Sequence, residues 1–191
     1  MGAALPTTPA MPFLPAALAE VHRSLRLPAD YAQRRGLTLQ AEATIDSLVT
    51  IALTKDGRLI QLSQPAAAAW MNLKRAADAA AILLIPISGF RSIARQTEII
   101  RDHLASGRPL EDILRLVAAP GYSEHHTGHA VDISTLDDLP LDAGFALTPA
   151  FIWLNTHATH FGFHLSFPED NPHRIAYEPW HWCWRPLSGT I

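Results

Sequence analysis

Two short segments of this 191-residue chain bring histidine and carboxylate side chains together. The first, SEHHTGHAVD, runs from Ser123 to Asp132, and the second, EPWH, runs from Glu178 to His181. Imidazoles and carboxylates are common zinc ligands, and both also serve as general acids and bases. The two segments therefore contain candidate residues for metal binding and for acid–base catalysis.

Two imidazoles and one carboxylate from these segments would be enough for a catalytic zinc site. Such a site has three protein ligands and leaves the fourth position to water or substrate, and zinc lowers the pKa of its water to about 7. Glu178, if it is not itself a ligand, would take the proton of that water and pass it to a leaving amine. Arg91, at the tip of the SGFRS loop, offers a guanidinium for a carboxylate or a developing oxyanion.

Local signals predict that each segment is a loop that enters a strand. Gly128 permits a sharp turn where a β-carbon would obstruct the chain. Pro179 excludes a regular helix over the EPWH block, which therefore differs from the helical His-Glu-x-x-His motif of other zinc peptidases. In a fully extended segment Glu178 and His181 would face opposite sides, so a bulge or a turn has to bring them to one pocket.

The elements that would position these residues are a mixture of helices and strands. An Asp56-Gly57 turn within residues 43–62 predicts a β-hairpin. Hydrophobic periodicity predicts helices over residues 64–80, 92–104, 110–117 and 149–160, and strands over 81–87, 129–134 and 175–184. Because strict βαβ alternation is missing, we expect a small α+β domain rather than a doubly wound sheet. Residues 1–21 are expected to be a loosely ordered arm.

Four ordered blocks of the chain resemble the zinc D-alanyl-D-alanine peptidases of the VanY/VanX type. This family includes LD-carboxypeptidases and phage L-alanyl-D-glutamate endolysins. The blocks are the SGFRS segment with Gln96, the SEHHTGHAVD signature, the stretch from Trp153 to Pro168 and the YEPWHW segment from Tyr177 to Trp182. The resemblance extends over about residues 64–184.

The resemblance implies a role for each of seven residues. The implied zinc ligands, for one ion per chain, are His125, Asp132 and His181. Glu178 would be the general base, and Arg91 would stabilise the tetrahedral intermediate or grip the substrate. Ser123 and Gln96 would contact the substrate.

The same resemblance implies a fold and a domain boundary. The family has a small α+β domain with a central antiparallel sheet flanked by helices, which it shares with the Hedgehog signalling domain. We expect the zinc peptidase domain over residues 41–191 and an N-terminal extension of unclear role over residues 1–40. His126 and His129 fall at variable positions of the signature, so we expect them to support the site or face substrate rather than bind metal. Cys183 stands where relatives commonly carry Arg.

The functional prediction is a zinc-dependent hydrolase that cuts a peptide bond involving D-amino acids in peptidoglycan or its precursors. The leading interpretation is a D-Ala-D-Ala or LD carboxypeptidase acting on a peptidoglycan peptide or muropeptide. Two alternatives stay open: an endopeptidase of the L-Ala-D-Glu endolysin type, and a non-catalytic, Hedgehog-like zinc-containing binding module. The presence of Glu178 and Arg91 argues against the binding module, because a structural zinc site needs neither.

Composition argues against several other classes of protein. The net charge of −3 and the pI near 6.3 argue against a nucleic-acid binder, and 48% hydrophobic with 17% charged residues excludes intrinsic disorder. The lone Cys183 excludes an intramolecular disulfide and is expected to be a buried, unreactive thiol. There is no apolar run of about 18 residues for a membrane helix, and residues 1–21 lack the Lys and Arg of a secretory signal. We therefore expect a cytoplasmic location, with export by another route as the alternative.

Overall fold

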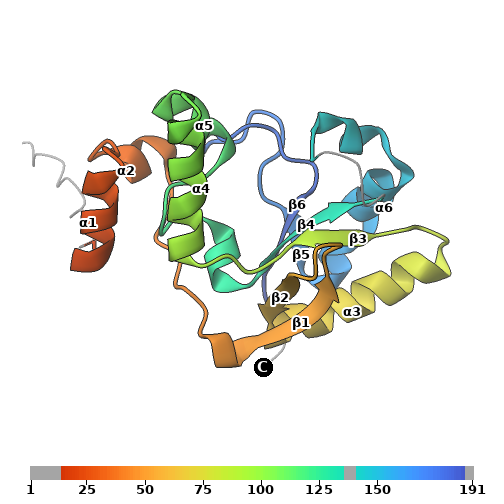
Figure 1. Cartoon of the computed structure of the whole chain (residues 1–191). Coiled ribbons are helices and arrows are strands. Elements are labelled where there is room, and N and C mark those ends of the chain that lie inside the picture. The colour runs from red at the N-terminus through yellow and green to blue at the C-terminus, as the bar shows by residue number, and fades with distance from the viewer. Residues whose placement is uncertain (1–13, 136–140, 188–191) are drawn as a thin grey trace, which may run out of the picture.

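A four-stranded antiparallel sheet with the strand order β3-β4-β6-β5 lies at the centre of the computed structural model, which describes residues 14–135 and 141–187 (Figure 1). Its strands are β3 (Ile85–Ser88), β4 (Ala130–Ser134), β5 (Phe163–Leu165) and β6 (His181–Trp184). A separate antiparallel hairpin is formed by β1 (Leu48–Leu53) and β2 (Leu59–Ser63). The predicted α+β class and the hairpin at Asp56-Gly57 are both confirmed.

Six α-helices surround these strands in the described part of the chain. They are α1 (Ala16–Ser24), α2 (Tyr31–Arg35), α3 (Gln64–Ala79), α4 (Ile93–Ala105), α5 (Leu110–Leu116) and α6 (Pro149–His157). Short 3-10 turns include η2 (Glu124–Thr127), which leads into β4, and η4 (Ala158–Phe161), which extends α6. None of these helices is long and apolar enough to cross a bilayer.

The longest helix, α3, covers one face of the sheet. Pro65 occupies its first turn, where a missing N–H costs nothing. Its buried residues Ala66, Trp70, Leu73 and Ala77 recur at helical spacing and pack into the main hydrophobic core. The same core contains residues of β4, β6 and α6, so α3 fixes the sheet from below (Figure 1).

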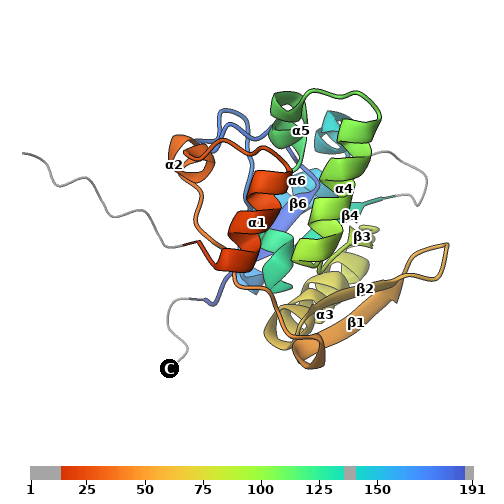
Figure 2. The same ribbon diagram turned by 60° about the vertical axis from the view of Figure 1, so that its left-hand side comes forward.

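A second, smaller core holds the N-terminal helices to the rest of the molecule. Leu25 and Tyr31 are buried there against Ile100 of α4 and Ile113 of α5. Figure 2 shows α1 and α2 beside α4 and α5, on the other side of the molecule from the β1-β2 hairpin. The main core thus lies against the sheet, and the smaller core lies against α4 and α5.

Three expected elements differ from the structure. Residues 16–21, predicted as part of an arm, lie in α1, because Leu18 and Val21 have a buried surface to pack against; residues 1–13 lie outside the described residues. The strand expected over 81–87 begins only at Ile85. The strand expected over 175–184 begins only at His181, because a turn precedes it, in which the His181 N–H donates to the Glu178 carbonyl at 3.1 Å.

Candidate metal centre and active site

Two paired strands place a carboxylate and an imidazole side by side. Val131 and Ile133 of β4 and Trp182 of β6 belong to the main core, so the side chains that alternate with them face the other way. Asp132 and His181 are direct cross-strand partners on that opposite face. The Asp132 Oδ1 atom lies 3.0 Å from the His181 Nδ1 atom.

The second imidazole enters from η2, directly before β4. The Nδ1 atom of His125 lies 2.7 Å from the Gly89 carbonyl oxygen. A carbonyl only accepts hydrogen bonds, so Nδ1 carries the proton and Nε2 carries the lone pair in the neutral ring. Burial lowers the pKa of His125 and keeps the ring neutral.

These three side chains fit a metal ion. One ligand atom from each of His125, Asp132 and His181 lies within 4.8 Å of the others, and all three residues are buried. The lone pair of His125 Nε2 faces the Asp132 Oδ2 atom at 3.3 Å, so two acceptors oppose each other where a cation would satisfy both. Nitrogen and carboxylate oxygen donors of this number suit zinc. The ligand atoms would be His125 Nε2, His181 Nδ1 and a carboxylate oxygen of Asp132.

Glu124 is the residue that sequence reasoning missed, because it falls at a variable position of the signature. Its Oε2 atom lies 3.0 Å from the Nε2 atom of His181, on the far side of that ring from Asp132. A carboxylate behind a metal-binding histidine fixes the orientation of the ring and raises its basicity. The sequence signal is weak, since Glu124 and His181 are 57 positions apart and meet only when β6 pairs with β4.

The two carboxylates give His181 a positive charge in the metal-free site. Burial alone would lower the pKa of His181, but its hydrogen bonds to Asp132 and Glu124 outweigh burial and raise it to about 10. Burial alone would raise the pKa of Glu124, but His181 outweighs burial and lowers it to about 2. A metal ion that binds His181 Nδ1 therefore replaces a proton, while the proton on Nε2 keeps its bond to Glu124.

Glu178 reaches the same cleft because of the turn that precedes β6. Its backbone N–H donates to the Phe167 carbonyl at 3.0 Å, which holds the turn against the neighbouring loop. Its side chain is buried and forms no hydrogen bond with any residue that the structure describes. Burial raises the pKa of Glu178 to about 7, with Asp132 adding to the effect and His181 opposing it. A divalent cation nearby would favour the anion and lower this pKa.

Arg91 enters the cleft from the loop between β3 and α4. Its guanidinium donates to Gln96 Oε1 at 3.1 Å and to Ser88 Oγ at 3.2 Å, and it lies 3.9 Å from Asp132 Oδ2. Gln96 is buried, and its amide nitrogen donates to the Ala118 carbonyl. The Gln96 amide oxygen thus holds Arg91, and its amide nitrogen fixes Gln96 to Ala118. The contact of Gln96 with substrate stays a prediction.

His126 secures the Arg91 loop from behind. Its Nδ1 atom lies 2.6 Å from the Arg91 carbonyl oxygen, and its Nε2 atom accepts from the Gly121 N–H at 3.1 Å. These bonds hold His126 against the Arg91 loop, and its role in supporting the site stays a prediction. Cys183, two positions after His181, is buried and outside the group of metal-ligating atoms, and burial raises the pKa of its thiol.

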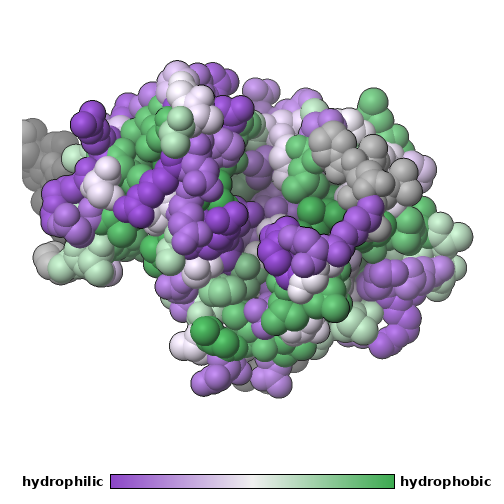
Figure 3. Space-filling model, in the orientation of Figure 1, coloured by the Kyte–Doolittle hydropathy of each residue, from purple (hydrophilic) through white to green (hydrophobic). Residues whose placement is uncertain are grey.

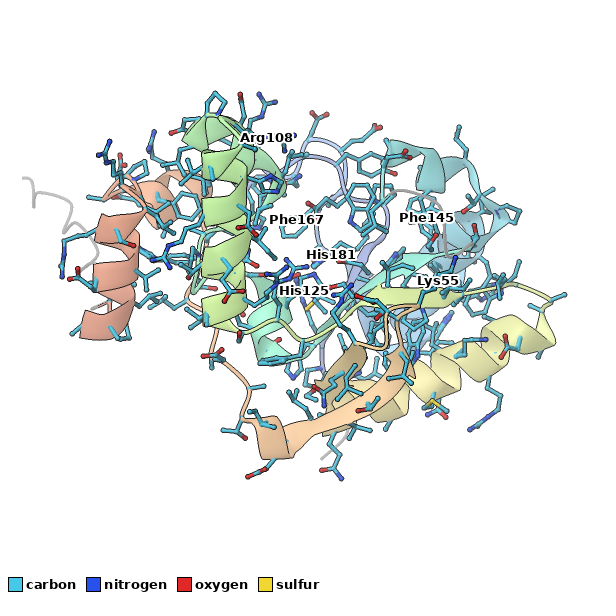
Figure 4. The ribbon with its side chains drawn as sticks, in the orientation of Figure 1. Lys55, Arg108, His125, Phe145, Phe167 and His181 are labelled. Atoms are coloured by element: carbon cyan, nitrogen blue, oxygen red, sulfur yellow. The ribbon has the colours of Figure 1, made fainter. Side chains whose placement is uncertain are left out.

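All seven residues that the sequence singled out line one cleft of about 350 Å³. They are Arg91, Gln96, Ser123, His125, Asp132, Glu178 and His181. The walls include Phe167 and Trp180 on one side and residues of α4 and α5 on the other. Figure 4 shows His125 and His181 pointing into the space beside α4, and Figure 3 shows the surface hollowed there between two raised parts. The roles of the seven residues stay predictions.

Gly128 lies at a close approach of two chain segments, and its replacement by alanine should destabilise the fold. Its φ is +70°, and a β-carbon there would lie 2.8 Å from the backbone nitrogen of Ser63, which donates to the Gly128 carbonyl. We expect Gly128→Ala to lower the free energy of unfolding by about 2–4 kcal/mol, since left-handed strain and a backbone clash add together. Urea unfolding in the presence of a chelator measures this loss without a metal contribution.

Gly57→Ala is the matched control for this substitution. Gly57 has a φ of +81°, and no described atom lies within 4 Å of the position that a β-carbon would take there. This variant should lose only the strain component, about 1 kcal/mol. Equal losses in the two variants would mean that the approach of Gly128 to Ser63 contributes nothing.

Comparison with known proteins gives a match over most of the described fold. The sequence profile of the VanY family, described as D-alanyl-D-alanine carboxypeptidase, matches residues 59–187. A D-alanyl-D-alanine carboxypeptidase of Enterococcus faecalis is 31% identical over 121 residues, which are 58% of this chain and 43% of that protein. The chain spans less than half the length of the curated relatives it matches.

Two solved structures extend the similarity to the fold. The LdcB LD-carboxypeptidase has a TM-score of 0.66 and 29% identity, over 76% of this chain and 70% of that one. A mutant of the vancomycin-resistance D,D-pentapeptidase VanY, in complex with Zn(II), has a TM-score of 0.56 and 26% identity, over 78% of this chain and 85% of that one.

Proposed function

Because the chain belongs to the VanY family of D-alanyl-D-alanine carboxypeptidases, we propose that it is a zinc-dependent peptidase that removes a terminal D-alanine from peptidoglycan peptides. The observation that carries this proposal is the placement of Glu178. A buried carboxylate without a hydrogen-bonding partner in the described residues faces the same cleft as the His125, Asp132 and His181 ligand set.

The zinc ion would be held by His125 Nε2, His181 Nδ1 and the Asp132 carboxylate. When bound, zinc supplies a Lewis acid that polarises the scissile carbonyl and acidifies water. The zinc complex of a VanY neighbour and the opposed acceptor atoms of this site support the choice of metal.

The protein's own groups perform the proton transfers. Glu178 takes a proton from the attacking water and delivers it to the nitrogen of the leaving D-alanine. Arg91, held by Gln96 and Ser88, presents a fixed positive charge to the oxyanion that develops at the scissile carbonyl. Glu124 keeps the His181 ring from rotating, and the walls of the cleft limit access of bulk water.

A panel of defined peptides, analysed by mass spectrometry, tests this proposal. The panel contains peptides that end in D-Ala-D-Ala, peptides that end in a single D-Ala after an L-residue, and peptides with an internal L-Ala-D-Glu bond. We expect the zinc-loaded protein to release one D-alanine from the first or second group and to leave the internal bond intact. Which of these two groups is cut identifies the DD or the LD specificity.

Chelation provides the second arm of the same test. 1,10-phenanthroline should reduce release of D-alanine by at least about 10³-fold, and added zinc should restore it. The 1,7 isomer, which does not chelate, is the control. Cleavage of the L-Ala-D-Glu bond would replace the proposal by an endopeptidase, and failure to cut any peptide would replace it by the binding module.

A further inference from the structure

A second pocket, with several arginines in its lining, lies next to the catalytic cleft. It has a volume of about 470 Å³ and lies between α2, α5 and the loop of residues 170–176. Figure 2 shows α2 and α5 on either side of this blue loop. The four arginines in its lining are Arg34, Arg35, Arg115 and Arg174, and we call it the arginine pocket.

The charges around the arginine pocket do not cancel. Its acidic lining residues are Glu111 and Asp170, and Asp30 pairs with Arg34 from outside the lining, so four cations face three carboxylates in a chain whose net charge is −3. Glu111 is 65% exposed and lies 3.9 Å from the Arg35 guanidinium, a distance at which water weakens the attraction. The excess positive charge is local and would favour an anion.

The four arginines differ in the polar contacts of their side chains. Arg35 is buried, lies over the ring of Tyr31 and donates to the Arg174 carbonyl at 3.0 Å. Arg34 pairs with Asp30, the residue directly before α2. The side chains of Arg115 and Arg174, in contrast, form no ion pair or hydrogen bond with any residue that the structure describes.

The backbone at Arg174 makes an arginine there unexpected on structural grounds. Its φ is +53°, a left-handed conformation in which Gly or Asn is favoured and a long side chain adds strain. The side chain of Arg174 lines the pocket, although glycine at this position would make the loop more stable.

The loop that carries Arg174 is fixed in place and joins the two cavities. Ile175 lines both the arginine pocket and the catalytic cleft. The Asn171 amide donates to the Ile175 carbonyl at 2.7 Å, and the Ala176 N–H donates to the Arg115 carbonyl at 2.8 Å. A ligand that extends from the cleft over Ile175 would therefore meet the guanidinium groups of the arginine pocket.

We propose that the arginine pocket binds an oxyanion that the substrate carries away from the scissile bond, either a carboxylate or a phosphate group. Guanidinium groups match the geometry of both anions. The inference rests on the proposed function for the connection between pocket and cleft. The helix α2, which precedes the residues matched by the family profile, completes this subsite.

Paired peptides test the carboxylate source. Two peptides that end in D-Ala-D-Ala and differ only by Glu or Gln, placed in turn at each of the three preceding positions, are compared by steady-state kinetics. We expect a KM about three- to tenfold lower for Glu at one of these positions, with kcat unchanged. Arg115→Ala and Arg174→Gly should remove the difference, whereas Arg108→Ala, an exposed arginine outside the pocket lining, should retain it.

Binding of inorganic pyrophosphate tests the phosphate source and needs no catalysis. Calorimetry should show binding to the wild-type chain that Arg174→Gly weakens at least about threefold, if the anion is a phosphate. Thermal unfolding separates binding from folding, because Arg174→Gly relieves strain and should leave Tm equal or higher. The proposal is overturned if Glu has no advantage over Gln and pyrophosphate does not bind. It is also overturned if the pocket variants and Arg108→Ala behave alike. Pyrophosphate binding remains measurable even if no peptide is cut, so this arm can fail or succeed independently of the proposed function.

Discussion

Glu178→Gln should reduce peptide hydrolysis by about 10²–10⁴-fold while zinc remains bound at one ion per chain. Glutamine has nearly the same size as glutamate, so its side chain fills the same buried position, and the backbone bond from residue 178 to the Phe167 carbonyl is unaffected. It cannot accept the proton of the attacking water and return it to the leaving nitrogen. The loss should therefore appear in kcat, with little change in KM.

The measurement is steady-state release of D-alanine together with metal content by mass spectrometry. Glu98→Gln, on the exposed face of α4, is the matched control and should keep wild-type activity. Wild-type turnover in Glu178→Gln would overturn the general-base assignment. Loss of zinc in that variant would instead make Glu178 a ligand.

His181→Ala should remove zinc almost completely, because it deletes one of three protein ligands at a buried site. The mutation also leaves Asp132 and Glu124 without the imidazolium that pairs with both of them. Among the described residues, Asp132 then keeps only Arg91 as a cationic partner, at 3.9 Å, and Glu124 only Arg185, at 3.9 Å. The metal-free protein should therefore lose stability as well, by about 3–5 kcal/mol. Zinc stoichiometry after dialysis and urea unfolding measure the two effects separately.

Variants at Glu124 should weaken zinc binding less than His181→Ala does. Glu124→Ala should weaken zinc binding by about 10–100-fold without abolishing it, as loss of an outer hydrogen bond to a metal ligand does. Glu124→Gln keeps an acceptor oxygen for His181 Nε2 and should lose less. His160→Ala, an exposed histidine outside the ligand group, should bind zinc like the wild type. Equal zinc affinity in Glu124→Ala and wild type would show that the 3.0 Å bond does not orient the ring.

The sequence predicted those features that depend on short-range patterns. Alternation around Asp56-Gly57 predicted the hairpin, and alanine-rich periodicity after Pro65 predicted α3. The need for a turn between Glu178 and His181 followed from the side-chain alternation of strands, and the structure contains that turn. Motif residues in separate blocks were also expected to share a pocket, and all of them line one cleft.

Features that depend on long-range packing were not visible in the sequence. Glu124 gains its role only through the pairing of β4 with β6, and the burial of Leu18 in α1 depends on contacts beyond its own segment. Arg35 and Arg174, 139 positions apart, meet in one pocket through a side-chain bond to a backbone carbonyl. No local propensity encodes such meetings, because they arise from the tertiary arrangement of α2 and the loop before β6.

The cross-strand pairing of Asp132 has a consequence for folding. Asp132 is paired with Ser88 on one side and with His181 on the other, and β3 reaches this alignment only through an irregularity between Pro86 and Ser88. A slip of one residue in β4 would turn its carboxylate into the main core and present an aliphatic side chain to the ligand histidines. With zinc bound as proposed, metal capture would select correctly registered molecules, and in refolding it would act as a proofreading step for the alignment of the sheet.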